Sequence, residues 1–188
     1  MTNSNGGVTK AAKMSDPDFV MNQQLCLTRS YAVETGEDVM ATIEGADAAA
    51  IAQQCEAFGN SLAQHVDALA RKPAAEVLSG VNRLILESGM TPEQLRTTAK
   101  VCMASGYKGD RMTQALGGAL LLTGLGERPY AELVGHHLQG GFGPAKTTDR
   151  ALNWYEMAFT ALDRDQTPIF APKQPGRVEV VRKAARSL

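Results

Sequence analysis

Apolar side chains recur at the spacing of an α-helix along most of this 188-residue chain. Between residues 51 and 69 the steps from one apolar residue to the next are 4, 3, 4, 4 and 3. Such steps place them on one helix face, and no stretch shows the sustained alternation of a half-buried strand. The pattern predicts an all-α fold. This stripe consists of Ile51, Cys55, Phe58, Leu62, Val66 and Leu69.

The composition favours the same fold class. Aromatic residues make up only 5% of the chain, whereas alanine occurs 27 times. A core of Ala, Leu, Val and Met suits closely packed helices better than a sheet, which favours aromatic and β-branched residues. The net charge of −1 provides no basic field, so we expect neither a nucleic acid nor an anionic lipid surface as partner.

Local signals divide the chain into seven or eight helices. Residues 16–18, Asp-Pro-Asp, form a helix start, with an N-cap, a first-turn proline and an acid near the positive end of the dipole. This helix is expected to reach Glu34 and stop at Gly36, and a short one is expected from Glu37 to Gly45. Later helices are expected to begin near Ala46, Pro73, Thr91, Asp110, Pro129 and Thr147 or Thr148.

The chain is expected to have three parts: a disordered lead (1–14), a helical repeat-like domain (15–165) and a proline-linked basic arm (166–188). Pro168, Pro172 and Pro175 forbid a regular helix between domain and arm. In the first interpretation the arm binds another copy or an acidic partner, with Val178, Val181, Ala185 and Leu188 as its docking face. In the alternative it folds back and covers a groove of its own domain. Its candidate interaction residues are Arg177, Val178, Val181, Arg182, Lys183 and Leu188.

The cysteines and the N-terminus predict a cytoplasmic protein. Cys26, Cys55 and Cys102 are odd in number and lie 29 and 47 residues apart, which matches neither a disulfide framework nor a zinc site. We expect three small buried hydrophobes in a reducing compartment. The first thirteen residues contain no apolar core of a secretory signal, and no apolar run approaches the roughly 20 residues of a membrane span.

One segment carries a repeated-helix motif. Residues 131–163 contain a glycine at 135, a G-x-G loop at 141–143, and then Ala151-Leu-x-Trp154-Tyr155-x-x-Ala158. This spacing closely resembles the Sel-one-like repeat, a relative of the tetratricopeptide repeat. A degenerate unit at 95–126 shares only the skeleton of the motif. The matching positions are Gly135, Leu138, Gly141, Gly143, Ala151, Trp154, Tyr155 and Ala158.

The resemblance implies a short α-solenoid of stacked helix pairs, and an irregular helical bundle is the alternative architecture. The motif positions also make physical sense by themselves. Gly135 lets two helices approach closely, and Gly141 and Gly143 supply turn positions with positive φ. Trp154 and Tyr155 are expected to fill the space between units. We expect Trp154 to be a packing residue and not a ligand-stacking one.

The histidines are the most tempting candidates for chemistry. Neighbouring residues in a helix point about 100° apart, so His136 and His137 cannot easily share a metal ion. Glu132 lies one turn before His136, which places a carboxylate and an imidazole on one face. We expect an ordinary surface or groove pair, and we expect His65 at the boundary of its helix stripe. The sequence indicates no catalytic, cofactor-binding or metal-binding residue.

The leading functional hypothesis is therefore a non-enzymatic interaction module that presents a helical groove to another protein or a peptide, with homo-oligomerisation left open. Two alternatives are a secretion-related chaperone or effector, and an enzyme or ligand-binding domain whose site only the fold assembles. A deep pocket lined by His65, His136 or His137 with carboxylates would favour the enzyme. A long open groove would favour the adaptor.

Overall fold

The computed structural model describes residues 16–45, 47–174 and 176–188, and the expected disordered lead (1–14) and Pro175 lie outside them. The described residues form eight α-helices and no strand, which confirms the all-α prediction. The helices are α1 (Pro17–Ala41), α2 (Ala48–Ala68), α3 (Ala74–Glu87), α4 (Pro92–Lys108), α5 (Met112–Gly124), α6 (Ala131–Gly140), α7 (Thr148–Asp163) and α8 (Arg177–Ala185). A short 3-10 helix, η2 (Arg128–Tyr130), precedes α6.

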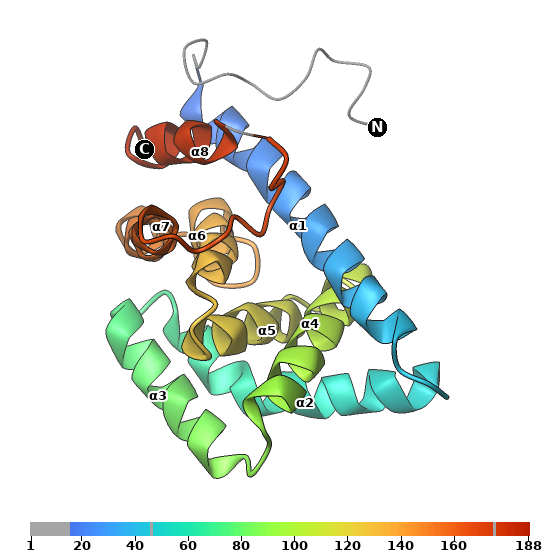
Figure 1. The fold of residues 1–188 in the computed structure, drawn as a ribbon. Coiled ribbons are helices and arrows are strands. Elements are labelled where there is room, and N and C mark those ends of the chain that lie inside the picture. The colour runs from blue at the N-terminus through green and yellow to red at the C-terminus, as the bar shows by residue number, and fades with distance from the viewer. Residues whose placement is uncertain (1–15, 46, 175) are drawn as a thin grey trace.

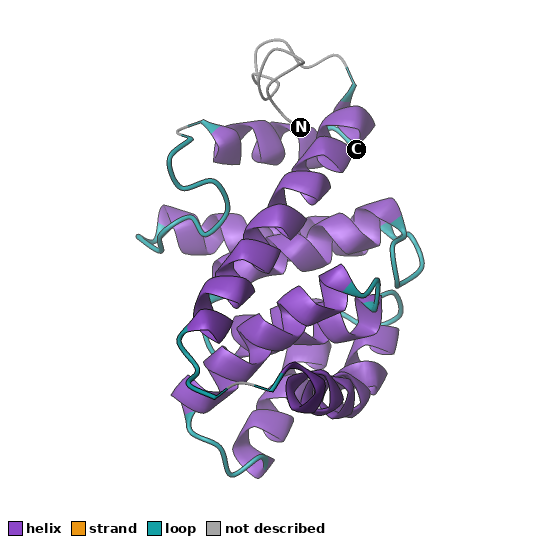
Figure 2. Cartoon of the chain, turned by 90° about the vertical axis from the view of Figure 1, so that its right-hand side faces the viewer, coloured by secondary structure: helices purple, strands orange, loops and turns teal. Residues whose placement is uncertain are grey.

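The helices lie in successive layers (Figure 1). Helix α8 is at one end, α6 and α7 lie beneath it, α4 and α5 come next, and α2 and α3 are at the far end. The 25-residue helix α1 runs along one side of these layers and packs against α4, α6 and α8. Figure 2 shows the same long helix crossing the stack from the side. Helix α1 therefore ties layers together that lie far apart in the sequence.

The first helix continues through Gly36, so the predicted stop there and the predicted second start at Glu37 are wrong. Gly36 is buried where α1 crosses α4. A Cβ atom at this position would lie 2.5 Å from the carbonyl oxygen of Lys100 and closer still to the Ala104 methyl group. Glycine costs about 1 kcal/mol in a helix interior relative to alanine. At position 36 the glycine permits the close approach of α1 and α4, and it does not end α1.

Most of the other local signals are confirmed. Thr91 and Gln94 form both hydrogen bonds of a capping box at the start of α4. Gly141 ends α6 with φ 70°, and Gly143 in the following loop has φ 92°, both in the left-handed region. The prediction that Asp110 caps the next helix is wrong. It takes a positive φ of 55° in the turn, and α5 begins two residues later.

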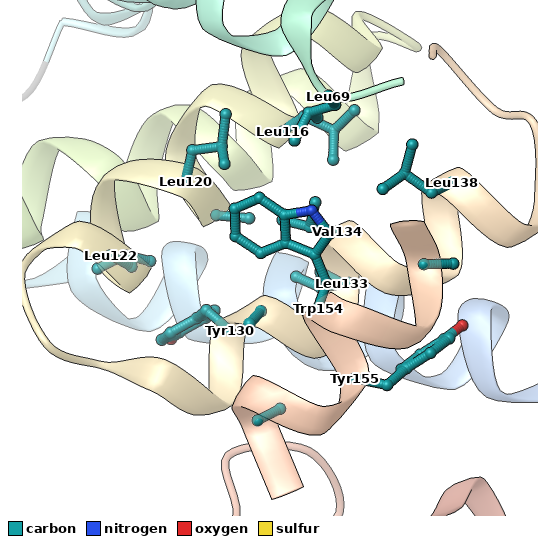
Figure 3. Packing of buried hydrophobic residues seen from close by; sticks show 14 of the residues in the cluster. Leu69, Leu116, Leu120, Leu122, Tyr130, Leu133, Val134, Leu138, Trp154 and Tyr155 are labelled. Atoms are coloured by element: carbon teal, nitrogen blue, oxygen red, sulfur yellow. The ribbon is translucent and has the colours of Figure 1, made fainter. Parts of the chain in front are cut away.

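Trp154 is a packing residue, as predicted, because only 1% of it is exposed. Figure 3 shows its indole among Leu116 and Leu120 of α5 and Val134 of α6. The side chain thus joins the α6–α7 pair to the layer below. Tyr155, the next residue, faces the other way, where its ring stacks at an edge against His136 with 5.2 Å between centroids.

Gly135 of α6 lies against the Tyr155 ring of α7. A Cβ atom there would lie 2.7 Å from Cε1 of the Tyr155 ring. The close contact that the motif predicts is therefore present. It is made by an aromatic side chain, whereas at Gly36 and Gly118 the neighbouring backbone itself limits the space.

The C-terminal segment packs onto the domain. Helix α8 contacts α1 and α7, and Val181 and Ala184 are fully buried. The segment therefore adopts the second interpretation, folding back over its own domain, and it is not decoupled by the prolines. The inward face differs from the predicted one, because Val178 is only partly buried and Leu188 is 38% exposed. The buried residues of α8 are Arg177, Val180, Val181, Ala184 and Ala185.

Arg182 of α8 and Arg186, the residue that follows α8, bind acids of the same chain. Arg182 forms two hydrogen bonds with the Asp163 carboxylate, at 2.7 and 3.1 Å. Arg186 does the same with Glu156, at 2.7 and 3.0 Å. Much of the positive charge that suggested an acidic external partner is thus neutralised within the domain.

The prediction of three reduced, buried cysteines is confirmed for the burial of Cys55 and Cys102, which are both 1% exposed, but it is wrong for the reduced state of that pair and for the burial of Cys26. Cys55 of α2 and Cys102 of α4 form a disulfide across 47 residues of sequence, and Cys26 is an exposed free thiol. The disulfide lies in a small satellite core with Val101. Sequence spacing could not reveal this pair, because it depends on where α2 crosses α4.

We predict that replacing Cys55 and Cys102 together with serine lowers the free energy of unfolding by about 2–4 kcal/mol, because the unfolded chain loses a constraint on a long loop. Chemical denaturation without reductant measures the change. Cys26→Ser is the control and leaves the denaturation midpoint in place. A double variant as stable as the parent would show that the two thiols are not joined in solution.

We predict that Gly135→Leu destabilises the protein by roughly 1–3 kcal/mol, since the new side chain meets the Tyr155 ring. A double-mutant cycle with Tyr155→Ala tests the cause, because removing the ring leaves room for the leucine. The penalty of Gly135→Leu then shrinks in the Tyr155→Ala background. An equal penalty in both backgrounds would locate the conflict elsewhere.

Candidate functional site

Four buried polar residues from three helices form one cluster, which we call the Glu132 network. Glu132 and His136 come from α6, Tyr155 from α7 and Arg177 from α8. None of the four is more than 4% exposed. Burying a charge in this way is costly unless it is paired and hydrogen-bonded.

Every member of the Glu132 network has a partner. The Arg177 guanidinium donates hydrogen bonds to both carboxylate oxygens of Glu132. Nη1 donates to Oε2 at 3.2 Å, and Nη2 donates to Oε1. His136 Nε2 lies 3.1 Å from the same Oε1, and the Tyr155 hydroxyl lies 2.9 Å from Nδ1. Since the carboxylate only accepts, Nε2 carries the proton and Nδ1 accepts from the Tyr155 hydroxyl. A continuous chain of hydrogen bonds therefore links α7, α6 and α8.

The charges of the network follow from this geometry. Burial by itself would raise the pKa of Glu132, but the Arg177 charge and the His136 hydrogen bond outweigh it and lower the pKa to about 2. Burial lowers the pKa of His136, against the opposing effect of Glu132. Burial also raises the pKa of the Tyr155 hydroxyl well above 10.0. At neutral pH the network holds an ion pair, a neutral imidazole and a neutral phenol.

His137 and Tyr107 form a second buried hydrogen-bonded group, which we call the His137 branch. Its Nδ1 donates to the Phe142 carbonyl oxygen at 2.6 Å, and its Nε2 lies 3.0 Å from the Tyr107 hydroxyl of α4. The Arg29 guanidinium lies over the Tyr107 ring, 5.1 Å from its centroid. Burial lowers the pKa of His137 to about 4. The expectation of a surface or groove pair at 136–137 is therefore wrong, because both imidazoles are buried between helices.

The Tyr155–His136–Glu132 order resembles the nucleophile, base and orienting acid of a catalytic triad. A triad, however, needs space for a reacting atom beside the nucleophile and its base. Here the Tyr155 hydroxyl is buried and both ring nitrogens of His136 already have protein partners. The hydrogen bonds of the network join α6, α7 and α8. Among the residues that the structure describes, no group of three or more His, Cys, Asp or Glu side chains could hold a metal ion.

An open hollow of about 470 Å³ runs along α1, and we call it the α1 groove. Its lining spans residues 26–37, which corresponds to about 16 Å at the helical rise of 1.5 Å per residue. Arg29 and Tyr107 belong to it, so the groove lies directly outside the His137 branch. The lining residues are Cys26, Arg29, Ser30, Val33, Glu34, Glu37 and Tyr107.

His65 lies in a different helix from His136 and His137. His65 is partly buried in α2, next to Gly80 of α3, at the boundary of its helix stripe as predicted. His136 and His137 belong to α6, and in Figure 1 the α4–α5 layer lies between α6 and α2. The α1 groove contains no residue that the sequence had suggested as a site.

Sequence reasoning found one part of the Glu132 network and missed the others. The four-residue step from Glu132 to His136 is visible on a helix face. Arg177 is 45 residues from Glu132 in the chain, and its role appeared only as one cation of a basic arm. A buried carboxylate such as that of Glu132 needs a cationic partner, and this requirement is the signal that could have indicated Arg177.

Comparisons with known proteins leave the family open. No family model, curated protein or solved structure matches the chain. In the described parts of the chain, no helix is long and apolar enough to cross a membrane.

We predict that acid destabilises the protein from about pH 6.5 down to pH 4 through His137. Its pKa is lowered on folding, so the stability is present above the unfolded value of 6.5 and is lost as pH falls toward the folded value of about 4. A shift of this size corresponds to roughly 3 kcal/mol. His137→Asn retains a donor for the Phe142 carbonyl oxygen but does not titrate.

Melting temperatures at pH 4–8 measure this effect. The stability of His137→Asn is expected to change less steeply with pH than that of the parent, with His136, His65 and Glu132 contributing to the remaining slope because their pKa values are lowered too. His65→Asn is the comparison variant: burial lowers the pKa of His65 as well, but that ring is only partly buried, so this substitution is expected to change the slope less. Parallel pH profiles of parent and His137→Asn would exclude His137 as the cause.

Proposed function

We propose that the protein is a non-enzymatic interaction module whose α1 groove binds an amphipathic helix of a partner protein. The observation that carries this proposal is a row of lining residues on α1 at positions 26, 30, 33 and 37. Their steps of 4, 3 and 4 follow one side of the helix, as in a helix–helix seam. The row borders an open hollow of about 470 Å³.

The lining chemistry suits a helix as ligand. Cys26 and Ser30 are small and exposed, so a second helix can approach α1 closely. Val33 and the Tyr107 ring supply apolar contact in the groove. Arg29 and Glu34 carry opposite charges on its sides, which favours a partner with both signs beside its apolar face. The expected partner is another protein or a peptide segment; a second copy of the chain is one candidate.

We also propose that α6 and α7 form a Sel-one-like unit and that α4 and α5 form a degenerate one. The support is the burial of Trp154 and Ala158, the glycine turn at 141–143 and the tight contact at Gly135. Proteins of the resembled family act as adaptors or scaffolds, which agrees with a groove-binding function.

The compartment predicted from the sequence was the cytoplasm, and that prediction rested in part on reduced cysteines. The Cys55–Cys102 disulfide supports an oxidising compartment instead, because such bonds are rare in cytosolic proteins. This observation favours the second hypothesis, a secretion-related chaperone or effector. Such a protein would use the α1 groove in the same way, without an active site.

The test fills the groove without touching the core. Ser30 is exposed, and its hydroxyl bonds only to the Cys26 carbonyl oxygen one turn earlier. Ser30→Trp is therefore expected to leave the melting temperature unchanged and to abolish partner binding. Ser61→Trp is the matched control, because Ser61 is equally an exposed helical serine bonded to a carbonyl one turn back, in α2.

A photoreactive residue at position 30 identifies the partner segment, with the same residue at position 61 as the control site. The proposal expects crosslinks from position 30 to one helical segment, and their loss when unlabelled parent protein competes. Equal crosslinking from both positions, or partner binding that survives Ser30→Trp, would contradict it.

A further inference from the structure

The row of α1 residues that borders the α1 groove continues beyond the groove in both directions. It extends from positions 26, 30, 33 and 37 back to Phe19 and Gln23 and forward to Met40, with steps of 4, 3, 4, 3, 4 and 3. Steps that alternate between four and three residues are the heptad spacing of a coiled-coil seam. Every seventh residue of the row is apolar. These apolar residues are Phe19, Cys26, Val33 and Met40.

This heptad row is accessible on the outside of the fold. Phe19 is 57% exposed, Cys26 and Ser30 are exposed, and Val33 and Met40 are only partly buried. Helix α1 lies at the outer edge of the layers in Figure 1, and Figure 2 shows it crossing the stack on the side that faces the viewer. At 1.5 Å per residue the row is about 31 Å long. A second helix can therefore pack along it.

Two opposite charges flank the row and determine which helix fits. Arg29 and Glu34 lie on opposite sides of it, at the g and e positions of the heptad. Between parallel helices, a g residue lies beside the e residue five positions further along the other helix. Two parallel copies of α1 therefore place Arg29 beside Glu34 of the other copy, twice. Reversing one helix would instead bring Arg29 to Arg29 and Glu34 to Glu34.

We propose that two copies of this chain associate through a parallel pairing of their α1 helices, each helix lying in the α1 groove of the other copy. The inference rests on the proposed function, because it names the helix that the groove binds. A two-fold axis parallel to α1 relates the copies, so equivalent residues face each other. The two Glu37 carboxylates meet in this seam, and each is neutralised by Lys108 of its own chain.

Sedimentation velocity of the full chain tests the pairing. The parent, of 20.0 kDa, is expected to double its mass as its concentration rises. Glu34→Arg brings two arginines together and Arg29→Glu brings two glutamates together, so each variant alone is expected to remain monomeric. When the two variants are mixed, opposite charges meet again, and dimers with one chain of each kind are expected. Asp38→Arg, an exposed acid of α1 outside the groove, is the matched control and dimerises like the parent.

A parent that is monomeric at every concentration overturns the proposal, and so does a mixture of the two folded variants that forms no dimer. Arg29 also lies over the Tyr107 ring, so the melting temperatures of the variants are compared first. Where Arg29→Glu fails to fold, Glu34→Arg decides by itself, because its side chain is exposed. A Glu34→Arg dimer as stable as that of the parent contradicts the pairing.

Cys26 reports the direction of the two helices. In the parallel pairing the two Cys26 thiols face each other, and oxidised glutathione converts them into a disulfide with release of two molecules of reduced glutathione. A covalent dimer is expected on a non-reducing gel, and Cys26→Ser abolishes it. Ser61→Cys in the Cys26→Ser background is the control, an exposed thiol on α2 that gives no covalent dimer. A parent that sediments as a dimer but is not crosslinked contradicts the parallel direction.

The pairing and the groove-binding function fail in different ways. A parent that stays monomeric while position 30 crosslinks to a helix of another protein overturns the pairing and leaves the groove function in place. Dimers that form equally well with Ser30→Trp lie on another surface, which overturns the pairing through the groove.

Discussion

The buried ion pair between Glu132 and Arg177 is the interaction on which the arrangement of the last three helices depends. A carboxylate that is 3% exposed inside a helix layer is tolerable only with a cation at its side. That cation comes from the first residue of α8, so the helix has one position in which its charge and that of Glu132 are both satisfied. Apolar residues of α8 then close over the same surface. A hydrophobic pair could be as stable, but it would define the register of α8 less uniquely.

The rest of the fold depends on small residues that let neighbouring helices approach one another closely. Gly36 lets α1 touch the backbone of α4, and Gly118 lets α5 approach α4 in the same way. Such contacts replace aromatic bulk, which this chain has in only 5% of its residues. The single tryptophan, Trp154, is among the largest fully buried side chains and is placed where two layers meet.

The two chemically suggestive histidines lie close to accessible surfaces, and His136 itself lines a hollow between the beginning of α1 and the end of α6. His136 and His137 use their nitrogens within the protein, and their low pKa values follow from that burial. The α1 groove lies outside the His137 branch, separated from it by Tyr107. The proposed function therefore concerns the α1 groove, and the buried histidines join the helices next to it.

Local signals in the sequence were sufficient for the fold class and for most helix boundaries. Helical spacing of apolar residues, the capping box at Thr91 and the glycine turn at 141 act over a few residues, and neighbours in the chain decide them. The roles of Gly36, Cys55 and Arg177 depended on partners far along the chain. Each of these residues faces a helix whose position results from the packing of the whole domain. For that reason only the tertiary structure could show that the glycine is a contact, the cysteine a crosslink and the arginine a buried counter-ion.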